Sequence, residues 1–248
     1  MKKLGLFTNF QFDDTLYRIY QDSLKEIIAK RTRGAQELQV ELINVLPQGN
    51  DFARDNKTIN TSLFESCFHT SLEYAINVQH CDVLALCFRD TYLHSLSEEL
   101  FIEDNYGDTG AQLISIVDCT LAACTKRKRL RNLALFSAND VSEDNYTRER
   151  FRASGYDVTS IFHDDEIAEL NRQAGLILDT SEPDKIDADA LRYICGTVES
   201  AAKVNKTNGI LTLGYYELCA IFAEGGLVIP VINMVDEHIK AIADAILS

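Results

Sequence analysis

Two apolar runs in the chain end in polar turns whose side chains could bind a ligand or move a proton. The runs cover residues 83–88 and 209–214. Short runs rich in branched residues are typical of buried parallel strands, and the turn at the carboxyl end of such a strand can hold a ligand. The polar side chains that follow the two runs are Arg89, Asp90, Tyr215, Tyr216 and Glu217. The phenol of Tyr215 can act as a general acid or base if a neighbouring cation lowers its pKa, or it can simply fill the mouth of a cleft. Asp90 and Glu217 can equally cap helices.

These turns belong to an internal repeat. The matched segments are residues 83–90 with 210–217, 4–8 with 133–137, and 113–118 with 231–236. Their offsets are 127 (215 minus 88), 129 (133 minus 4) and 118 (236 minus 118), without gaps inside any pair. The first pair places Phe88 opposite Tyr215. Three matches in the same order predict two related halves, a period much longer than that of solenoid repeats.

The elements between the matched segments predict an α/β fold. Strands alternate with helices, among them an expected helix from Leu16 to Ile28, a second from Thr61 to Val78, and a strand over residues 113–117. Such alternation predicts doubly wound parallel sheets, one in each half. We expect an N-terminal lobe made of residues 1–105 and 222–248, and a C-terminal lobe made of residues 106–221.

Composition excludes several classes of protein. The 248 residues carry a net charge of -14 with a pI near 4.7, which argues against a nucleic-acid partner. The seven cysteines are scattered without a Cys-x-x-Cys pair, so neither a disulfide framework nor a zinc site is expected. The apolar run at the N-terminus ends at Phe7, and no run approaches the length of a membrane span. A cytoplasmic protein without a membrane partner is expected.

Two charged clusters invite a functional interpretation. Residues 126–129 read Lys-Arg-Lys-Arg, and we expect them to form the last turn of a helix over residues 119–130, where cations complement the helix dipole. Residues 163–166 read His-Asp-Asp-Glu, but neighbouring residues of one loop rarely converge on a single ion. No metal site is expected.

Several segments resemble the aspartate/glutamate racemase superfamily. They are residues 7–16, 139–151, 214–218 and 229–232. The resemblance spans nearly the whole chain and implies two pseudo-symmetric lobes with the active site in the cleft between them. It also implies catalysis without a cofactor, in which one cysteine from each lobe acts on opposite faces of the substrate. One thiolate removes the α-proton and the other thiol reprotonates the opposite face.

The chain departs from the family pattern at both catalytic positions. Tyr215 stands where the family has the cysteine of the second lobe, and Phe88 stands at the cysteine of the first lobe. Cys87 is one residue away. Because a one-residue step turns a strand side chain to the other face, Cys87 can substitute only if the strand end is bulged or the turn is remodelled. The catalytic candidates are therefore Tyr215 and Cys87, although a free cysteine at a strand end is often a small buried hydrophobe.

The resemblance also suggests substrate-binding residues. Arg54 lies in a loop that resembles the family's carboxylate-binding loop, where a guanidinium can hold a carboxylate with two hydrogen bonds. The full set is Arg54, Arg89, Asp90, Tyr216, Glu217, Lys185 and Asn9. Arg54 and Lys185 can also be solvated surface charges. A small carboxylate or amino acid such as aspartate or glutamate is the expected ligand, and a homodimer is a candidate assembly.

Three functions remain open from the sequence. The first is a cofactor-independent enzyme acting at the α-carbon, with weakened or altered catalysis. The second is a pseudoenzyme that binds a small ligand. The third is an interaction protein whose cleft is filled by Phe88, Tyr215 and Tyr216.

Overall fold

The described part of the chain forms two compact units. The computed structural model describes residues 2–8, 14–33, 38–44, 61–86, 107–127, 129–137, 145–160, 169–170, 172–173, 188–213 and 227–248. Unit 1 contains the described residues up to Ser115 together with His238–Ser248, and unit 2 contains those from Ile116 to Glu237. The lobe boundaries expected at 105/106 and 221/222 fall outside the described residues, so they stay a prediction. No described helix is long and apolar enough to cross a membrane.

Unit 1 is built on a parallel sheet with strand order β2-β1-β3-β4. Its strands are β1 (Leu4–Thr8), β2 (Val40–Asn44), β3 (Val83–Leu86) and β4 (Gln112–Ile114). The side chains of Val83, Leu84 and Ala85 are all buried, although they alternate between the two faces of the sheet. A strand covered on both faces needs an unbroken apolar run, which explains the sequence pattern.

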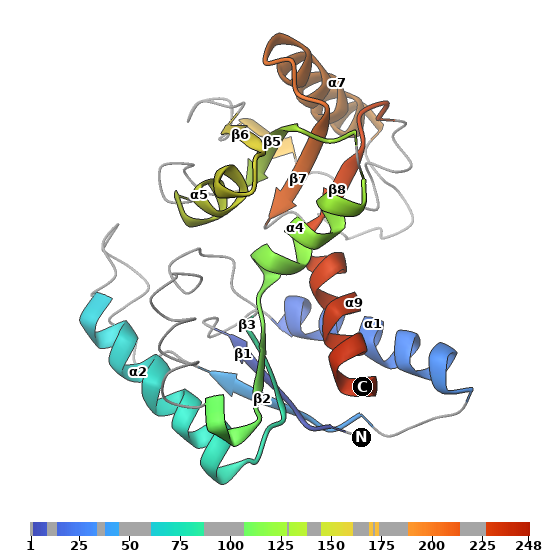
Figure 1. The fold of residues 1–248 in the computed structure, drawn as a ribbon. Helices are drawn as coiled ribbons and strands as arrows, with labels where there is room; N and C mark the ends of the chain where they lie inside the picture. The colour runs from blue at the N-terminus through green and yellow to red at the C-terminus, as the bar shows by residue number, and fades with distance from the viewer. Residues whose placement is uncertain are drawn as a thin grey trace. The chain divides into compact units, whose positions relative to one another are not determined.

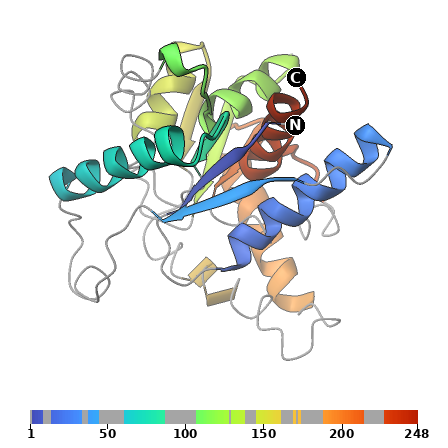
Figure 2. The same ribbon diagram turned by 90° about the horizontal axis from the view of Figure 1, so that it is seen from below.

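Helices cover both faces of this sheet (Figures 1 and 2). On one face lie α2 (Thr61–Glu73) and the π-helical turn that continues it, Tyr74–Val78. Phe68 and Leu72 of α2 share a buried cluster with Phe7 and Leu84 of the sheet. On the other face α1 (Asp14–Thr32) lies beside the second half of α9 (Met234–Leu247), which belongs to unit 1 from His238 onward. The helices expected from residue 16 to 28 and from 61 to 78 are confirmed.

Unit 2 repeats the plan with the strand order β6-β5-β7-β8, again fully parallel. The strands are β5 (Asn132–Ser137), β6 (Asp157–Ser160), β7 (Gly209–Leu213) and β8 (Val231–Asn233). α7 (Ala188–Val204) packs Ile194 and Val198 against Ala134 and Ile210 of the sheet. A Cβ at Gly209 would approach a methyl carbon of Leu133 to 2.9 Å, so a larger residue there would need that leucine side chain to shift. The expected pair of doubly wound parallel sheets is confirmed.

Two further described helices of unit 2 are α4 (Ile116–Lys126) and α5 (Asn145–Ala153). Two expectations for this region are wrong. Residues 116 and 117 begin α4 and do not extend β4, which ends at Ile114. α4 ends at Lys126 and not at residue 130, so only the first residue of the basic run lies in its last turn. The buried side chains of Ile116, Val117 and Thr120 explain the early start, because they place one face of α4 against the core.

The strand ladders correct the alignment of the two halves at β3 and β7. Gly5 pairs with Leu84 in unit 1, and Ala134 pairs with Ile210 in unit 2. With β1 and β5 related by 129, Leu84 therefore corresponds to Ile210, an offset of 126 (210 minus 84). Leu84 and Ile210 each belong to a buried cluster between their sheet and the helix that precedes their strand. The expected offset of 127, which equates Leu84 with Leu211, is wrong within the described strands.

Candidate functional site

Each sheet has a switch point between its two central strands. The chain leaves β1 toward β2 on one side, and β3 lies on the other side of β1. Phe7 pairs with Leu86, so β1 and β3 end at the same edge of the sheet. In unit 2 the equivalent strands β5 and β7 end together, with Ser137 paired to Leu213. In doubly wound sheets, ligands bind at the carboxyl ends of strands at such a switch point.

The site residues expected from the sequence flank these strand ends in the chain. Asn9 directly follows β1, Cys87 directly follows β3, and Tyr215 comes two residues after β7. All of the expected site residues lie outside the described ones: Asn9, Arg54, Cys87, Arg89, Asp90, Lys185, Tyr215, Tyr216 and Glu217. Their roles stay predictions, as does the overlay of Phe88 on Tyr215.

The described cysteines narrow the choice of a catalytic thiol. Burial raises the pKa of Cys81 and of Cys124 to about 11 and also raises that of Cys195. These thiols stay protonated near neutral pH, and a thiol must ionise before it can remove a proton. They therefore serve as small core residues. Among the described residues, no three His, Cys, Asp or Glu side chains are grouped in a way that could hold a metal ion.

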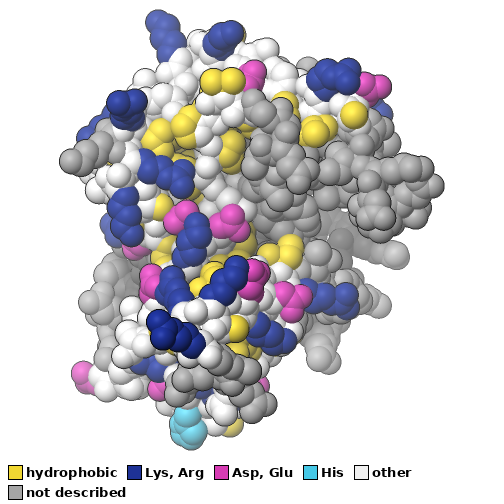
Figure 3. Space-filling model, turned by 90° about the vertical axis from the view of Figure 1, so that its right-hand side faces the viewer, with side chains coloured by type: hydrophobic (Ala, Val, Ile, Leu, Met, Phe, Trp, Pro, Cys, Tyr) yellow, Lys and Arg dark blue, Asp and Glu magenta, His cyan; other side chains and the backbone are white. Residues whose placement is uncertain are grey.

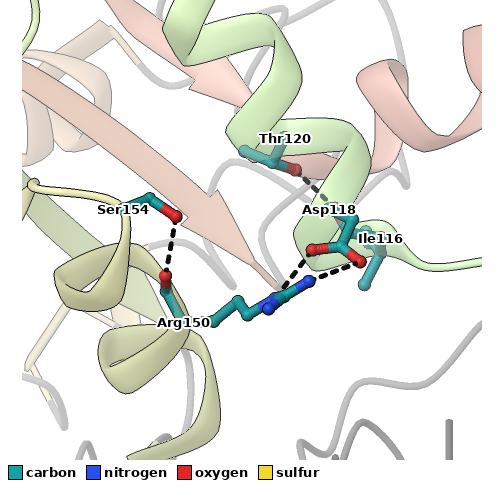
Figure 4. A network of polar contacts seen from close by, with 5 residues as sticks. All are labelled: Ile116, Asp118, Thr120, Arg150 and Ser154. Carbon is teal, nitrogen blue, oxygen red and sulfur yellow. Dashed lines mark hydrogen bonds and ion pairs between the residues drawn. The ribbon is translucent and has the colours of Figure 1, made fainter.

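An ion pair joins the start of α4 to α5 in unit 2 (Figure 4). Arg150 donates from Nε to Asp118 Oδ1 at 2.9 Å and from an Nη atom to Asp118 Oδ2 at 3.3 Å. The two bonds run side by side, which fixes the guanidinium plane. Asp118 lies in the first turn of α4, where a carboxylate is favoured by the helix dipole.

Two hydrogen bonds within the helices support this pair. Thr120 donates to the carbonyl of Ile116 at 2.7 Å, and Ser154 donates to the carbonyl of Arg150 at 3.2 Å (Figure 4). No role is predicted for Asp118 or Arg150 from the sequence. The sequence signal for Asp118 was an acidic residue near the start of a helix. Its partner Arg150 carries no such signal, because it lies 32 residues away in another helix.

A buried polar network joins α1, β4 and α9 in unit 1. His238 is fully buried, and its Nε2 lies 2.8 Å from the carbonyl oxygen of Ile114. Because a carbonyl can only accept, Nε2 carries the proton and Nδ1 accepts a hydrogen bond from the Tyr20 hydroxyl at 2.8 Å. Burial lowers the pKa of His238 from 6.5 to about 4, against the opposing effect of the bond to Ile114. The imidazole is therefore neutral at physiological pH.

The network has a structural role in positioning the end of β4. Ile114 is the last residue of that strand, and the chain enters unit 2 two residues later. The imidazole ring of His238 also packs edge-on against the Tyr20 ring, with centroids 5.6 Å apart. Sequence reasoning missed both residues, because Tyr20 and His238 are separated by 218 positions.

Comparison with known proteins identifies the fold. No family model and no curated protein sequence matches the chain. An aspartate racemase homologue from Pyrococcus horikoshii matches with a TM-score of 0.73 and 16% identity, over 100% of both chains. Glutamate racemase from Francisella tularensis, in complex with D-glutamate, matches with a TM-score of 0.60 and 9% identity. The match covers 99% of this chain and 81% of the glutamate racemase chain. Unliganded arylmalonate decarboxylase matches with a TM-score of 0.55 and 11% identity, over 99% of this chain and 92% of the decarboxylase chain. The chain therefore has the fold of the aspartate/glutamate racemases.

Proposed function

We propose that the protein binds a small carboxylate or amino acid, such as aspartate or glutamate, and acts at its α-carbon without a cofactor. The observation that carries the proposal is the pair of equivalent switch points, β1/β3 and β5/β7, each followed in the chain by residues suited to ligand binding or proton transfer. The similar structures agree with this choice of ligand. One is a glutamate racemase with D-glutamate bound, and another is named for a malonate, which is also a small carboxylate.

The charge of the chain requires a local cation for such a ligand. A protein with a net charge of -14 repels a dicarboxylate at long range, so the site must offset this with nearby positive groups. Arg54, Arg89 and Lys185 are the residues that we assign to this role. Arg54 is the principal carboxylate anchor, because a guanidinium can form two parallel bonds to one carboxylate.

The proposed chemistry is proton transfer at the α-carbon. A base in line with the Cα–H bond takes the proton and leaves a carbanion, and an acid on the opposite face returns a proton to give the other enantiomer. We assign Tyr215 to one face and Cys87 to the other. A phenol is a weaker acid than the usual thiol and Cys87 does not align with Tyr215, so inversion is slower than in a relative with two cysteines.

Removal of the Arg54 guanidinium tests the binding step. Arg54→Ala should weaken the binding of aspartate or glutamate by ~1.5 to 3 kcal/mol, the usual worth of a hydrogen bond to a charged group. Isothermal calorimetry measures the change. Arg33→Ala, which removes an exposed cation after the end of α1, is the matched control and should leave the affinity unchanged. An unchanged affinity in Arg54→Ala would remove that residue from the site.

Deuterium exchange tests the chemical step. With L- or D-glutamate or aspartate in D2O, we expect slow incorporation of deuterium at the α-carbon and still slower formation of the opposite enantiomer. Mass spectrometry and chiral chromatography follow the two processes separately. Exchange without inversion would indicate one active base. Binding without exchange would favour the pseudoenzyme, and the absence of both would refute the proposal.

A further inference from the structure

Unit 2 has a cluster of exposed cations that the proposed site does not use. We call it the basic edge and define it by six residues: Lys126, Arg127, Arg129, Arg131, Lys203 and Lys206. Lys126 and Lys203 lie at the ends of α4 and α7, and the other four lie in the segments that join α4 to β5 and α7 to β7. Since β5 and β7 are neighbours, the two segments meet at the amino-terminal edge of the sheet. The proposed ligand site lies at the opposite edge.

Hydrogen bonds hold the two segments together. The Asn208 side chain accepts from the backbone N–H groups of Arg131 and Asn132, and it donates to the carbonyl of Arg129 at 2.9 Å. The Asn132 side chain donates in turn to the carbonyl of Lys206. These bonds tie the backbone at Arg129 and Arg131 to the backbone at Lys206, so the two segments stay side by side.

The helix dipole accounts for Lys126 and Lys203, which lie in the last turns of α4 and α7, but not for the three arginines. α4 ends at Lys126, so the arginines of the segment that follows lie beyond its last turn. Arg127 approaches Glu237 at 3.8 Å, and the Arg131 guanidinium lies over the ring of Tyr156 at 5.5 Å. Within the described part of the chain, the other four cations of the basic edge form no ion pair. Asp157 begins β6 at the same edge and Glu237 approaches Arg127, so the described acidic residues offset the six cations only in part.

Two exposed apolar side chains accompany the charges. Val204 is 80% exposed and directly follows Lys203, and Val228 is 87% exposed and lies just before β8 at the same edge of the sheet. The backbone N–H of Val228 donates to Glu199 of α7 at 3.0 Å, which ties the second valine to the helix that carries the first. Figure 3 shows blue Lys and Arg side chains, with yellow hydrophobic ones between them, over the upper part of this face.

We propose that the basic edge docks on an anionic phospholipid surface. Clustered Lys and Arg side chains are attracted to negatively charged headgroups, and exposed aliphatic side chains can enter the headgroup boundary. This departs from the expectation of no membrane partner, which rested on the absence of an apolar run long enough to span a membrane. At physiological salt, charges farther than about 8 Å from the contact are largely screened, so the local cluster decides the interaction.

The composition of the edge favours lipid over the other anionic partners. Single-stranded nucleic acid binds through exposed aromatic rings that stack on bases, and Tyr156 of this edge is buried beneath Arg131. A peptide that adds a strand needs the open flank of a sheet, whereas this edge presents the ends of strands. A membrane surface needs neither exposed aromatic rings nor an open flank of a sheet. Docking in this way contacts the edge opposite to the carboxyl ends of the same strands.

Vesicle binding by the full-length protein tests the assignment. The probe is vesicles of phosphatidylcholine with about one third phosphatidylserine, compared with phosphatidylcholine alone, in cosedimentation at low and at physiological salt. We expect binding only to the anionic vesicles, and weaker binding as salt rises. The variant Lys126→Gln, Arg129→Gln, Lys203→Gln, Lys206→Gln should bind at least ~10-fold more weakly, because each cation near an anionic surface contributes roughly fivefold.

Control variants separate the local cluster from net charge. Lys25→Gln, Lys30→Gln, Arg33→Gln, Arg192→Gln removes the same number of exposed cations elsewhere and should bind as the wild type does. Val204→Ser, Val228→Ser should weaken binding about threefold or more while keeping its salt dependence. Circular dichroism confirms that each variant is folded. No binding to anionic vesicles, equal binding by the two fourfold variants, or binding to oligouridylate or polyglutamate in place of vesicles would overturn the proposal.

Discussion

Acidification from pH 6.5 to about 4 is expected to destabilise the folded protein by about 3 kcal/mol through His238 alone. The folded state keeps this imidazole neutral, while the unfolded chain takes up a proton near pH 6.5. Between the two pKa values the unfolded state binds more protons, so its free energy falls relative to the folded state as the pH falls. The contribution is fully present above pH 6.5, and below about pH 4 no more is lost.

Urea unfolding across this range measures the effect. His238→Gln keeps a polar side chain but cannot titrate, so its stability should fall about 3 kcal/mol less than that of the wild type between the two pH limits. At neutral pH the variant should itself be ~1 to 3 kcal/mol less stable, because a buried hydrogen bond to Tyr20 or Ile114 is lost. Carboxylates that titrate in the same range contribute equally to both proteins and cancel in the difference.

Direct titration of the imidazole gives an independent measurement. The ring proton resonances of His238 should stay unshifted when the pH falls from about 7 to about 5, whereas a solvated histidine titrates near 6.5. A titration midpoint near 6.5 for His238, or parallel stability curves for the wild type and the glutamine variant, would show that the buried network does not exist as described.

Replacing the phenol of Tyr215 is expected to slow α-proton exchange by ~100- to 10,000-fold, equivalent to ~3 to 5 kcal/mol of transition-state stabilisation. Tyr215→Phe keeps the ring and removes only the hydroxyl that we assign to proton transfer. The rate of deuterium incorporation into glutamate or aspartate is the measurement, and calorimetry checks that the ligand still binds. Tyr74→Phe, which alters an exposed tyrosine beside Gln79 in unit 1, is the matched control and should exchange at the wild-type rate.

A companion variant distinguishes one base from two. If Cys87 supplies the second face, Cys87→Ser should suppress inversion more strongly than exchange. An unchanged exchange rate in Tyr215→Phe would exclude that phenol as the base. Rapid racemisation that Cys87→Ser abolishes would instead mean that the strand end is remodelled and that the thiol has taken the family's usual role.

The sequence predicts the two parallel sheets well because their strands are buried on both faces. Unbroken apolar runs such as 83–86 and 209–213 are hard to mistake for surface elements. The same unbroken apolar pattern makes the register of these strands hard to predict. A run without alternation matches another almost equally well after a one-residue slip, which is why Leu84 aligned with Leu211 and not with its structural counterpart Ile210.

The polar features depend on contacts that no local pattern carries. His238 is a single histidine in an amphipathic helix, and nothing in its neighbourhood indicates Tyr20 or the carbonyl of Ile114 as partners. The end of α4 was misplaced because the basic run is itself a good helix-ending signal. The candidate site was predicted from the turns that follow the strands, and those turns lie outside the described residues.

The assignment of the last eleven residues to unit 1 affects the order of folding during synthesis. The described strands of unit 1 emerge from the ribosome before unit 2, yet the part of α9 that contains His238 emerges after it. At the usual speed of translation, about 120 intervening residues take roughly 6 to 25 seconds to make. During that interval Tyr20 and the end of β4 lack their buried partner, while unit 2 already has all the strands of its own sheet. The half encoded first is therefore the half completed last, and until then a chaperone has access to the apolar face of α1.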